Sequence, residues 1–212
     1  MKDAVTVEEM REYDRYTIEN LTDSKTLMLR AAQGIFDSYD FKGKKTAIVC
    51  GSGNNGGDGY ALAGILQKNG ESVDIFKVSE KFSEDGKYYF NLLRGKEVGV
   101  FTFTEEVSFS GYDVVVDCIF GTGFSGEPKG ICKTAIEKIN DSGAYVISAD
   151  INSGLNGNTG EAAIAVKSDL TVSIGFYKVG MFAENAKNYI KSLVNVDIGI
   201  VKPDLSHKQK FF

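Results

Sequence analysis

The sequence predicts an α/β fold in which a parallel sheet is covered by helices on both faces. Three observations predict it. Short apolar runs of β-forming residues alternate with helical patterns along most of the 212 residues, as in parallel sheets with right-handed crossovers. Two of these runs lead into glycine-rich turns, and residues 112–120 form a nearly continuous apolar run typical of a buried central strand.

A helical arm is predicted for the first part of the chain, at about residues 1–40. The segment Thr6-Val7-Glu8-Glu9 has the spacing of a capping box, and a helix is predicted to follow it. A second helix is predicted from about Ser24 or Thr26 to Phe36. We expect this arm to serve packing or dimer formation rather than catalysis.

The chain is predicted to form a single domain (1–212), in which residues from about 44 to 200 form the sheet and its covering helices. Apolar runs predict seven strands, at residues 45–50, 72–78, 98–103, 112–120, 144–149, 169–174 and 193–198. Apolar residues with the spacing of a helix follow Gly59 and recur at residues 83–94 and 128–142. A helix or loop is expected at residues 183–191.

Composition excludes several classes of protein. A net charge of −5 argues against a broad nucleic-acid or anionic-membrane surface. Cys50, Cys118 and Cys132 form neither a CxxC pair nor an even set, which favours a reducing compartment. Neither a signal peptide nor a membrane span is recognisable, so a cytoplasmic location is expected. His207, in the charged C-terminal segment, is expected to be solvated.

The first glycine-rich turn has the pattern G-x-G-x-x-G at Gly51, Gly53 and Gly56. Such a turn presents helix N-terminal N–H groups to an anion. Asp58, which we expect in the first helical turn, would repel a pyrophosphate there, and the second strand ends without the acidic residue that holds a ribose in NAD-binding proteins. Asn54 and Asn55 add side-chain amides that suit a neutral polar group, a cation or a phosphate.

A second turn of the same pattern follows the fourth strand, at Gly121, Gly123 and Gly126. In a doubly wound sheet of order 3-2-1-4-5, strands 1 and 4 are neighbours, and ligands bind between their carboxyl ends. The sequence therefore predicts that both turns border one crevice. The polar side chains expected beside them are Asn54, Asn55, Asp117, Asp150 and Ser153.

Each of these side chains has more than one interpretation. Asp117 either accepts structural hydrogen bonds from loop N–H groups or binds a cation together with Asn55 and Ser153. Asp150 either caps a turn or acts as an acid/base group, for which it is the best candidate. Cys118 is expected to be a buried thiol rather than a nucleophile, and Lys178 either lines the crevice or is exposed.

Six segments in register resemble one known family, over residues 5 to about 200. The segments are TVEEMREYDRYTIEN, GSGNNGGDGYALA, VDCIFGTGFSGEP, DINSGLNGNTG, DLTVSIGFYKVGM and VDIGI. This combination resembles the NAD(P)H-hydrate epimerase family, which includes the apolipoprotein A-I-binding protein and the N-terminal half of bacterial bifunctional nicotinamide-repair enzymes.

The resemblance implies a Rossmann-like three-layer α/β/α fold and a homodimeric isomerase that interconverts the R and S forms of hydrated NADH and NADPH. It implies that the enzyme acts with a separate or fused NAD(P)H-hydrate dehydratase. By motif position, the implied substrate contacts are Asn54, Asn55, Gly56, Gly57, Asp58, Gly121, Thr122, Gly123, Phe124, Ser125, Gly126, Glu127 and Asp150. A potassium ion would be held by Asn55, Asp117 and Ser153.

Two positions depart from the family pattern. Asn152 stands where the family commonly has proline, which we expect to loosen the turn that carries Asp150 and Ser153. Leu29 replaces a usual acidic residue and is expected to alter a local contact or the dimer.

Our hypothesis is that Asp150 protonates the leaving hydroxyl of the hydrate and activates the returning water. Asp150→Asn is then expected to abolish epimerisation and to leave the fold intact. A non-catalytic nucleotide-binding or scaffold module of the same fold is the alternative. A nicotinamide-dependent oxidoreductase is less favoured, because the ribose-binding carboxylate is missing.

Overall fold

The computed structural model describes residues 4–203, and its centre is a seven-stranded sheet. The strands are β2 (Thr46–Cys50), β3 (Val73–Lys77), β4 (Gly99–Thr102), β5 (Val114–Cys118), β6 (Tyr145–Ala149), β7 (Leu170–Ile174) and β9 (Leu193–Val196). Their order is β4-β3-β2-β5-β6-β7-β9, and neighbouring strands pair in parallel. This confirms the predicted order, with its reversal between β2 and β5.

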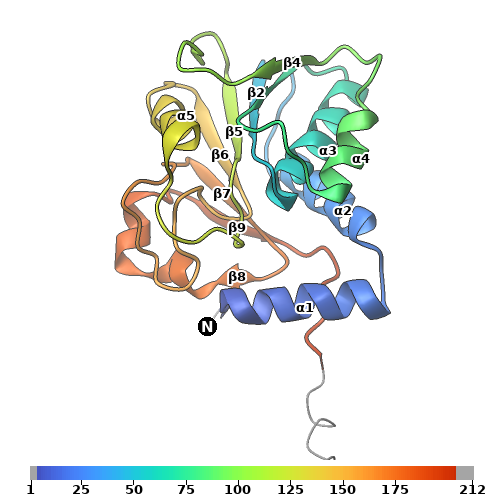
Figure 1. Ribbon diagram of the computed structural model, residues 1–212, viewed down its shortest axis with the longest axis vertical. Helices are drawn as coiled ribbons and strands as arrows, with labels where there is room; N and C mark the ends of the chain where they lie inside the picture. Colours follow the sequence, from blue (N-terminus) through green and yellow to red (C-terminus); the bar gives the residue numbers. More distant parts are fainter. Residues whose placement is uncertain (1–3, 204–212) are drawn as a thin grey trace, which may run out of the picture.

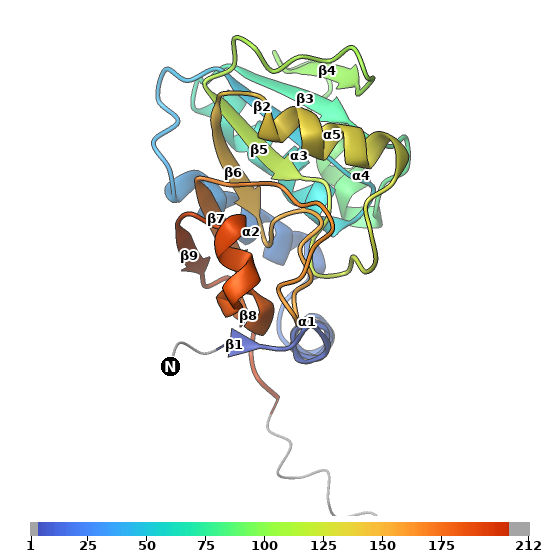
Figure 2. The ribbon, with the colours of Figure 1, turned by 90° about the vertical axis from the view of Figure 1, so that its left-hand side faces the viewer.

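Helices cover both faces of the sheet, which confirms the three-layer Rossmann-like fold. In Figure 1, α2, α3 and α4 lie on one side of the strands and α5 lies on the other; Figure 2 shows α5 in front of the sheet. The helices are α1 (Val7–Asn20), α2 (Ser24–Asp37), α3 (Asn54–Lys68), α4 (Glu84–Asn91) and α5 (Gly130–Asn140). The segment expected to be a helix or loop forms two short 3₁₀ helices, η1 (Val179–Phe182) and η2 (Glu184–Asn188).

Side chains of the central strands alternate between two apolar cores. Along β2, Ile48 and Cys50 belong to the core beneath α2 and α3, while Ala47 and Val49 belong to the core beneath α5. The period of two is that of a strand, and burial on both faces explains why these strands appear in the sequence as continuous apolar runs.

The N-terminal arm begins as predicted and then makes a contact that the sequence did not reveal. Thr6 caps α1, because its Oγ1 accepts from the Glu9 N–H at 3.2 Å and its own N–H donates to the Glu9 carboxylate at 2.7 Å. Just before it, β1 (Ala4–Val5) pairs in parallel with β8 (Tyr177–Lys178). In Figure 1, α1 lies across one end of the molecule, apart from the other helices.

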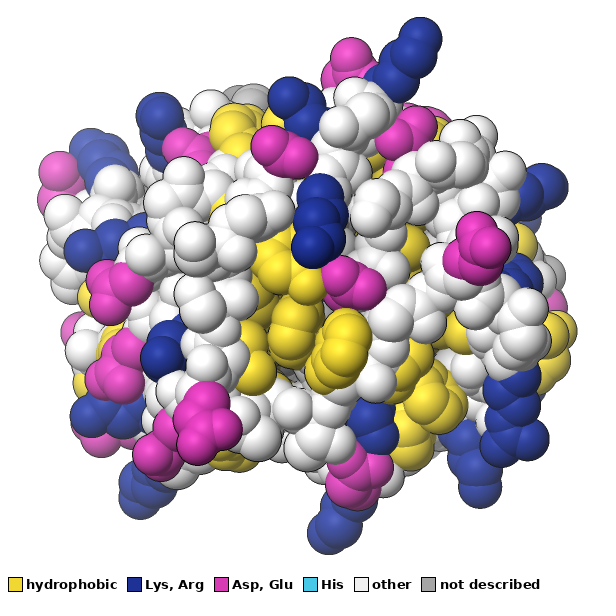
Figure 3. All heavy atoms as spheres, turned by 90° about the horizontal axis from the view of Figure 1, so that it is seen from above, with side chains coloured by type: hydrophobic (Ala, Val, Ile, Leu, Met, Phe, Trp, Pro, Cys, Tyr) yellow, Lys and Arg dark blue, Asp and Glu magenta, His cyan; other side chains and the backbone are white. Residues whose placement is uncertain are grey.

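The surface carries charges of both signs. Figure 3 looks onto the end of the molecule where β4 lies in Figure 1, and basic and acidic side chains are interspersed there around a group of apolar ones. Val100 and Phe101 of the edge strand β4 are exposed. In the part of the chain between residues 4 and 203, the helices are too short or too polar to cross a bilayer. His207 lies outside the described residues.

Candidate active site

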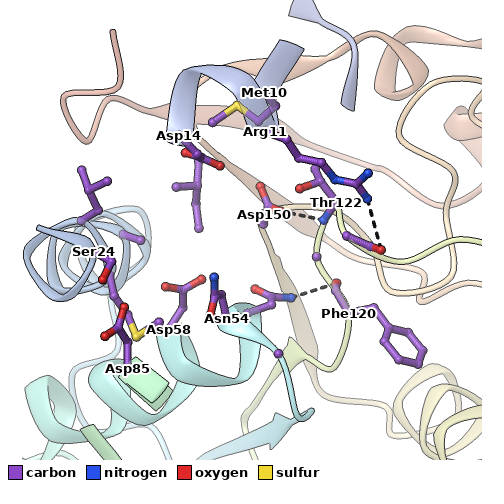
Figure 4. Close-up of a pocket in the computed structure, with 18 of the residues that line it drawn as sticks. Met10, Arg11, Asp14, Ser24, Asn54, Asp58, Asp85, Phe120, Thr122 and Asp150 are labelled. Carbon is purple, nitrogen blue, oxygen red and sulfur yellow. Dashed lines mark hydrogen bonds between the residues drawn. The ribbon is translucent and has the colours of Figure 1, made fainter. Parts of the chain in front are cut away.

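A pocket of about 590 Å³ lies where the strand order reverses. Its walls come from α1, α2, the start of α3, the loop after β5 and the end of β6 (Figure 4). Both glycine-rich turns line this pocket. The first turn contacts the end of β5, which leads into the second, since the Gly51 N–H donates to the Cys118 carbonyl at 3.0 Å. A Cβ on Gly51 would lie 2.0 Å from the Ile119 carbonyl oxygen, so only glycine permits this approach. The predicted meeting of the two turns is confirmed.

The N-terminus of α3 forms one wall and is open to a ligand. The helix begins at Asn54, and its N-cap residue, Gly53, supplies no side-chain hydrogen bond to the first N–H groups. Such uncapped N–H groups favour an anion. The helix starts earlier than we predicted, so the expectation that Asp58 lies in the first turn is wrong: no acidic residue lies there.

The implied substrate contacts fall into two groups. Those that line the pocket are Asn54, Asn55, Asp58, Gly121, Thr122, Gly123, Phe124 and Asp150. The others are not part of its lining. Gly56 packs beneath, where a Cβ would lie 2.1 Å from the Gly51 carbonyl oxygen, and Gly57 faces Met28. Ser125 is exposed, and Gly126 and Glu127 line a second, polar hollow.

Asp150 is held in a defined orientation at the end of β6. Its φ of 65° is the only positive value at a non-glycine residue among those described, a conformation that Asp and Asn tolerate better than other side chains. Its Oδ2 accepts from the Thr122 N–H at 3.0 Å. Gly121 makes room for this, because a Cβ there would lie 2.9 Å from the same oxygen.

Lys178 is the partner of Asp150, and neither sequence alternative for it is correct. Its side chain is completely buried, and its ammonium group forms an ion pair with Asp150 Oδ1. The ammonium also donates to the Ile174 carbonyl at 3.0 Å. A lysine without exposed surface needs such a partner. The one signal in the sequence was a lone charge in the apolar stretch IGFYKVGMF.

Asp117, Ser153 and Asn55 are brought together beside the pocket floor. The buried Asp117 carboxylate accepts from Ser153 Oγ at 2.5 Å and from the Ser153 N–H at 2.9 Å. It also accepts from Ser148 Oγ and the Ile119 N–H, so its partners are neutral. Burial raises the pKa of Asp117, and the hydrogen bonds from Ser153 oppose that rise. The structural interpretation of Asp117 is confirmed; its cation role stays a prediction.

The oxygen atoms of this cluster fit a hard cation. Asn55 Nδ2 donates to the Phe120 carbonyl at 2.9 Å, which leaves Asn55 Oδ1 buried without a hydrogen-bond partner. Buried acceptors are almost always satisfied, and amide, carboxylate and hydroxyl oxygens are the ligands that hard cations prefer. No group of three His, Cys, Asp or Glu side chains placed to hold a metal occurs within residues 4–203.

The expectation that Asn152 loosens its turn is wrong. Asn152 is completely buried. Its Nδ2 donates to the carbonyls of Val166 at 2.9 Å and Tyr189 at 3.0 Å and to Ser168 Oγ at 3.0 Å. Its Oδ1 accepts from Thr171 Oγ1 at 2.6 Å. The side chain therefore ties the turn that carries Asp150 to three later segments. Leu29 is exposed on α2.

Asn152→Ala is expected to lower the free energy of unfolding by about 2–4 kcal/mol, because it leaves several buried polar groups without a partner. Urea unfolding followed by circular dichroism measures the change. Asn20→Ala is the matched control: Asn20 is exposed and its Nδ2 donates to the Tyr16 carbonyl, so a change within about 0.5 kcal/mol is expected. Equal effects of the two substitutions would contradict the role of Asn152.

Further carboxyl groups line the pocket, among them those of Asp58 and Asp14. Asp58, on α3, is buried, and burial, followed by the nearby charges of Asp150 and Asp14, raises its pKa well above the usual range. Asp14, on α1, lines the same pocket and was not among the predicted site residues. Arg11, one turn earlier, donates to the Gly123 carbonyl at 3.4 Å. The arm thus contributes to the pocket as well as to packing.

The order of the sheet, with a pocket at the point where it reverses, defines a Rossmann-like α/β protein. Carboxyl groups line this ligand pocket, and the uncapped N-terminus of α3 forms one of its walls. Within this class, the chain belongs to the NAD(P)H-hydrate epimerase family. The family described as "YjeF-related protein N-terminus" matches residues 24–180, and relatives with that enzyme name match nearly the whole chain. The predicted family is confirmed.

Individual relatives show how far the similarity extends. The NAD(P)H-hydrate epimerase of Lentilactobacillus buchneri is 35% identical, over 95% of this chain and 97% of its own length. The NAD(P)H-hydrate epimerase of Weissella koreensis is 32% identical, over 98% of this chain and 96% of its own length. A bifunctional NAD(P)H-hydrate repair enzyme, Nnr, of Coxiella burnetii is 31% identical over 91% of this chain, which corresponds to 40% of that protein. The crystal structure of yeast YNL200c has the same fold, with a TM-score of 0.73 at 20% identity over 91% of this chain and 87% of the yeast chain.

Proposed function

We propose that this protein is an isomerase that interconverts the R and S forms of hydrated NADH and NADPH, with Asp150 as its acid/base group. The names of the relatives support the reaction. The single structural observation that carries the proposal is Asp150, which faces the pocket from a fixed backbone conformation and is bound by Lys178 and the Thr122 N–H.

The reaction needs proton transfer and no redox cofactor. The hydrated carbon carries a hydroxyl group and is bonded to the ring nitrogen. Loss of the hydroxyl as water leaves an iminium-like ring, and water can add to either face of it. Asp150, which is ion-paired with Lys178, donates the proton with which the hydroxyl leaves and accepts the proton of the water that adds. The N–H groups at the start of α3 and in the loop after β5 bind the nucleotide phosphates.

We further propose that a potassium ion binds to Asn55, Asp117 and Ser153. The support is the unpartnered Oδ1 of Asn55 and the neutral surroundings of the Asp117 carboxylate. When bound, the ion supplies positive charge beneath the pocket and fixes the loop after β5. The homodimer, the cytoplasmic location and cooperation with a dehydratase stay predictions; longer relatives named as bifunctional repair enzymes are consistent with the last.

The purified protein is expected to interconvert separated hydrate epimers of NADH and NADPH, which NMR follows directly, and to do so faster in potassium chloride than in choline chloride. Potassium is also expected to raise the midpoint of thermal unfolding, since it binds only the folded protein. In Asn55→Ala this thermal shift is expected to be lost. Absence of epimer conversion would contradict the function, whereas conversion without any potassium effect would contradict only the ion.

A further inference from the structure

Asp14 is a carboxyl group of the pocket that has no part in the chemistry above. Asp14 lies on α1 and lines the pocket, and Figure 4 shows Asp14, Asp58 and Asp150 directed toward the same space from three separate elements. No hydrogen bond or ion pair of the Asp14 side chain occurs among the described residues. A partly buried carboxyl without a partner is costly, so its presence in the pocket calls for a ligand.

Asp14 and Asp150 have opposite surroundings. The Asp150 carboxylate forms an ion pair with the buried ammonium of Lys178. Asp14 has no such partner: burial, followed by the negative charge of Asp150, raises its pKa to about 6, although Lys178 partly opposes this. The other charged or titratable groups that line the pocket are Arg11 on α1, Asp58 on α3 and Asp85 on α4. Two carboxyl groups that differ in this way are typical of an acid and a base in one active site.

We propose that Asp14 is a second catalytic residue of the epimerase: it donates the proton with which the hydroxyl group of the hydrate departs, while Asp150 accepts the proton of the water that adds. This inference rests on the proposed function. It divides between two residues the work that the sequence assigned to Asp150 alone, and it gives the helical arm a part in catalysis.

The proposed step balances in atoms and charge. The carbon–oxygen bond breaks, the lone pair of the ring nitrogen forms a carbon–nitrogen double bond, and the hydroxyl leaves with the Asp14 proton as water. A water molecule then forms the new carbon–oxygen bond from the side of Asp150, which takes its proton. The reverse reaction begins with the proton on Asp150, and exchange with solvent resets the pair. Nothing is oxidised or reduced.

Asp14→Asn tests this assignment. With the uncatalysed rate subtracted at each pH, kcat is expected to fall at least about 100-fold and KM to change less than about threefold. In the wild type, kcat is expected to fall as the pH rises through about 6, where Asp14 loses its proton; the variant should lack this fall. Glu19→Gln, at an exposed position on the same helix, is the matched control and should keep full activity.

Stability separates a catalytic role from a structural one. Because the pKa of Asp14 is raised in the folded protein from 3.8 to about 6, ionisation of this carboxyl lowers the stability of the fold as the pH rises from about 4 to about 6, and the full cost remains above pH 6. Asp14→Asn removes that cost, so its thermal midpoint at pH 8 should be no lower than that of the wild type. If it folds poorly, Asp14→Ser provides the same kinetic test. If the wild type is active and the Asp14 variant has an unchanged kcat, or only a raised KM, the role of Asp14 is overturned and the proposed function stands. If the wild type itself is inactive, the proposed function is overturned.

Discussion

Asp150→Asn is expected to slow epimerisation by about 10²- to 10⁴-fold, the usual contribution of a general acid/base group. Asparagine is the right substitution, because residue 150 has a φ of 65° and asparagine tolerates this conformation. An amide can still accept from the Thr122 N–H, so the geometry of the loop is kept while the proton acceptor is lost. The rate is measured by NMR on separated hydrate epimers.

The control for this experiment is Asp141→Asn, an exposed aspartate at the end of α5, which should keep full activity. Activity of Asp150→Asn within a few-fold of the wild type would contradict the role of Asp150. From the sequence, this substitution was expected to leave the fold intact. The structure changes that expectation, since the variant leaves the ammonium of Lys178 buried without a counter-charge.

Lys178→Met is expected to lower the free energy of unfolding by about 3–5 kcal/mol, because it leaves a carboxylate in the protein interior without its ion-pair partner. The side chain of Lys178 has no exposed surface, and that of Asp150 is 15% exposed. Urea unfolding gives the change. Epimerisation should fall as well, since Asp150 loses the ion-pair partner that holds its carboxylate in place.

A double-mutant cycle isolates the pair. The double variant Asp150→Asn/Lys178→Met removes both charges. Its loss of unfolding free energy should therefore be smaller than the sum of the losses in the two single variants. Lys187→Met is the matched control: the Lys187–Glu184 pair is exposed on η2, and loss of such a pair costs about 0–1 kcal/mol. If the single effects of the Asp150→Asn and Lys178→Met substitutions simply add, the two side chains are not energetically coupled.

The sheet and the location of the pocket could be predicted because they depend on local patterns. Apolar runs of strand length mark the strands, and right-handed crossovers then fix the order β4-β3-β2-β5-β6. In this order the turns after β2 and β5 must meet, which is why Asn55, Asp117 and Ser153 could be grouped before any coordinates. Their proximity follows from topology and needs no knowledge of side-chain contacts.

What the sequence could not reveal depends on contacts between distant side chains. Lys178 was left open because its one local signal, a lone charge in an apolar stretch, does not distinguish a buried ion pair from an exposed lysine. Asp14 lies in a helix rich in charged residues, and its place in the pocket depends on how α1 crosses the end of the sheet. Asn152 was misjudged because comparison with proline considers only the backbone, whereas its side chain bonds to four later residues.

The short pairing of β1 with β8 ties the first residues that the structure describes to both sides of the pocket. Val5 is the register partner of Lys178, and Thr6 starts the helix that carries Asp14. Ala4 and Val5 do not line the pocket, yet proteolytic trimming or a fusion tag that displaced them would disturb both sides of it at once. For this protein, inactivity of an N-terminally altered preparation would say little about the residues that perform the chemistry.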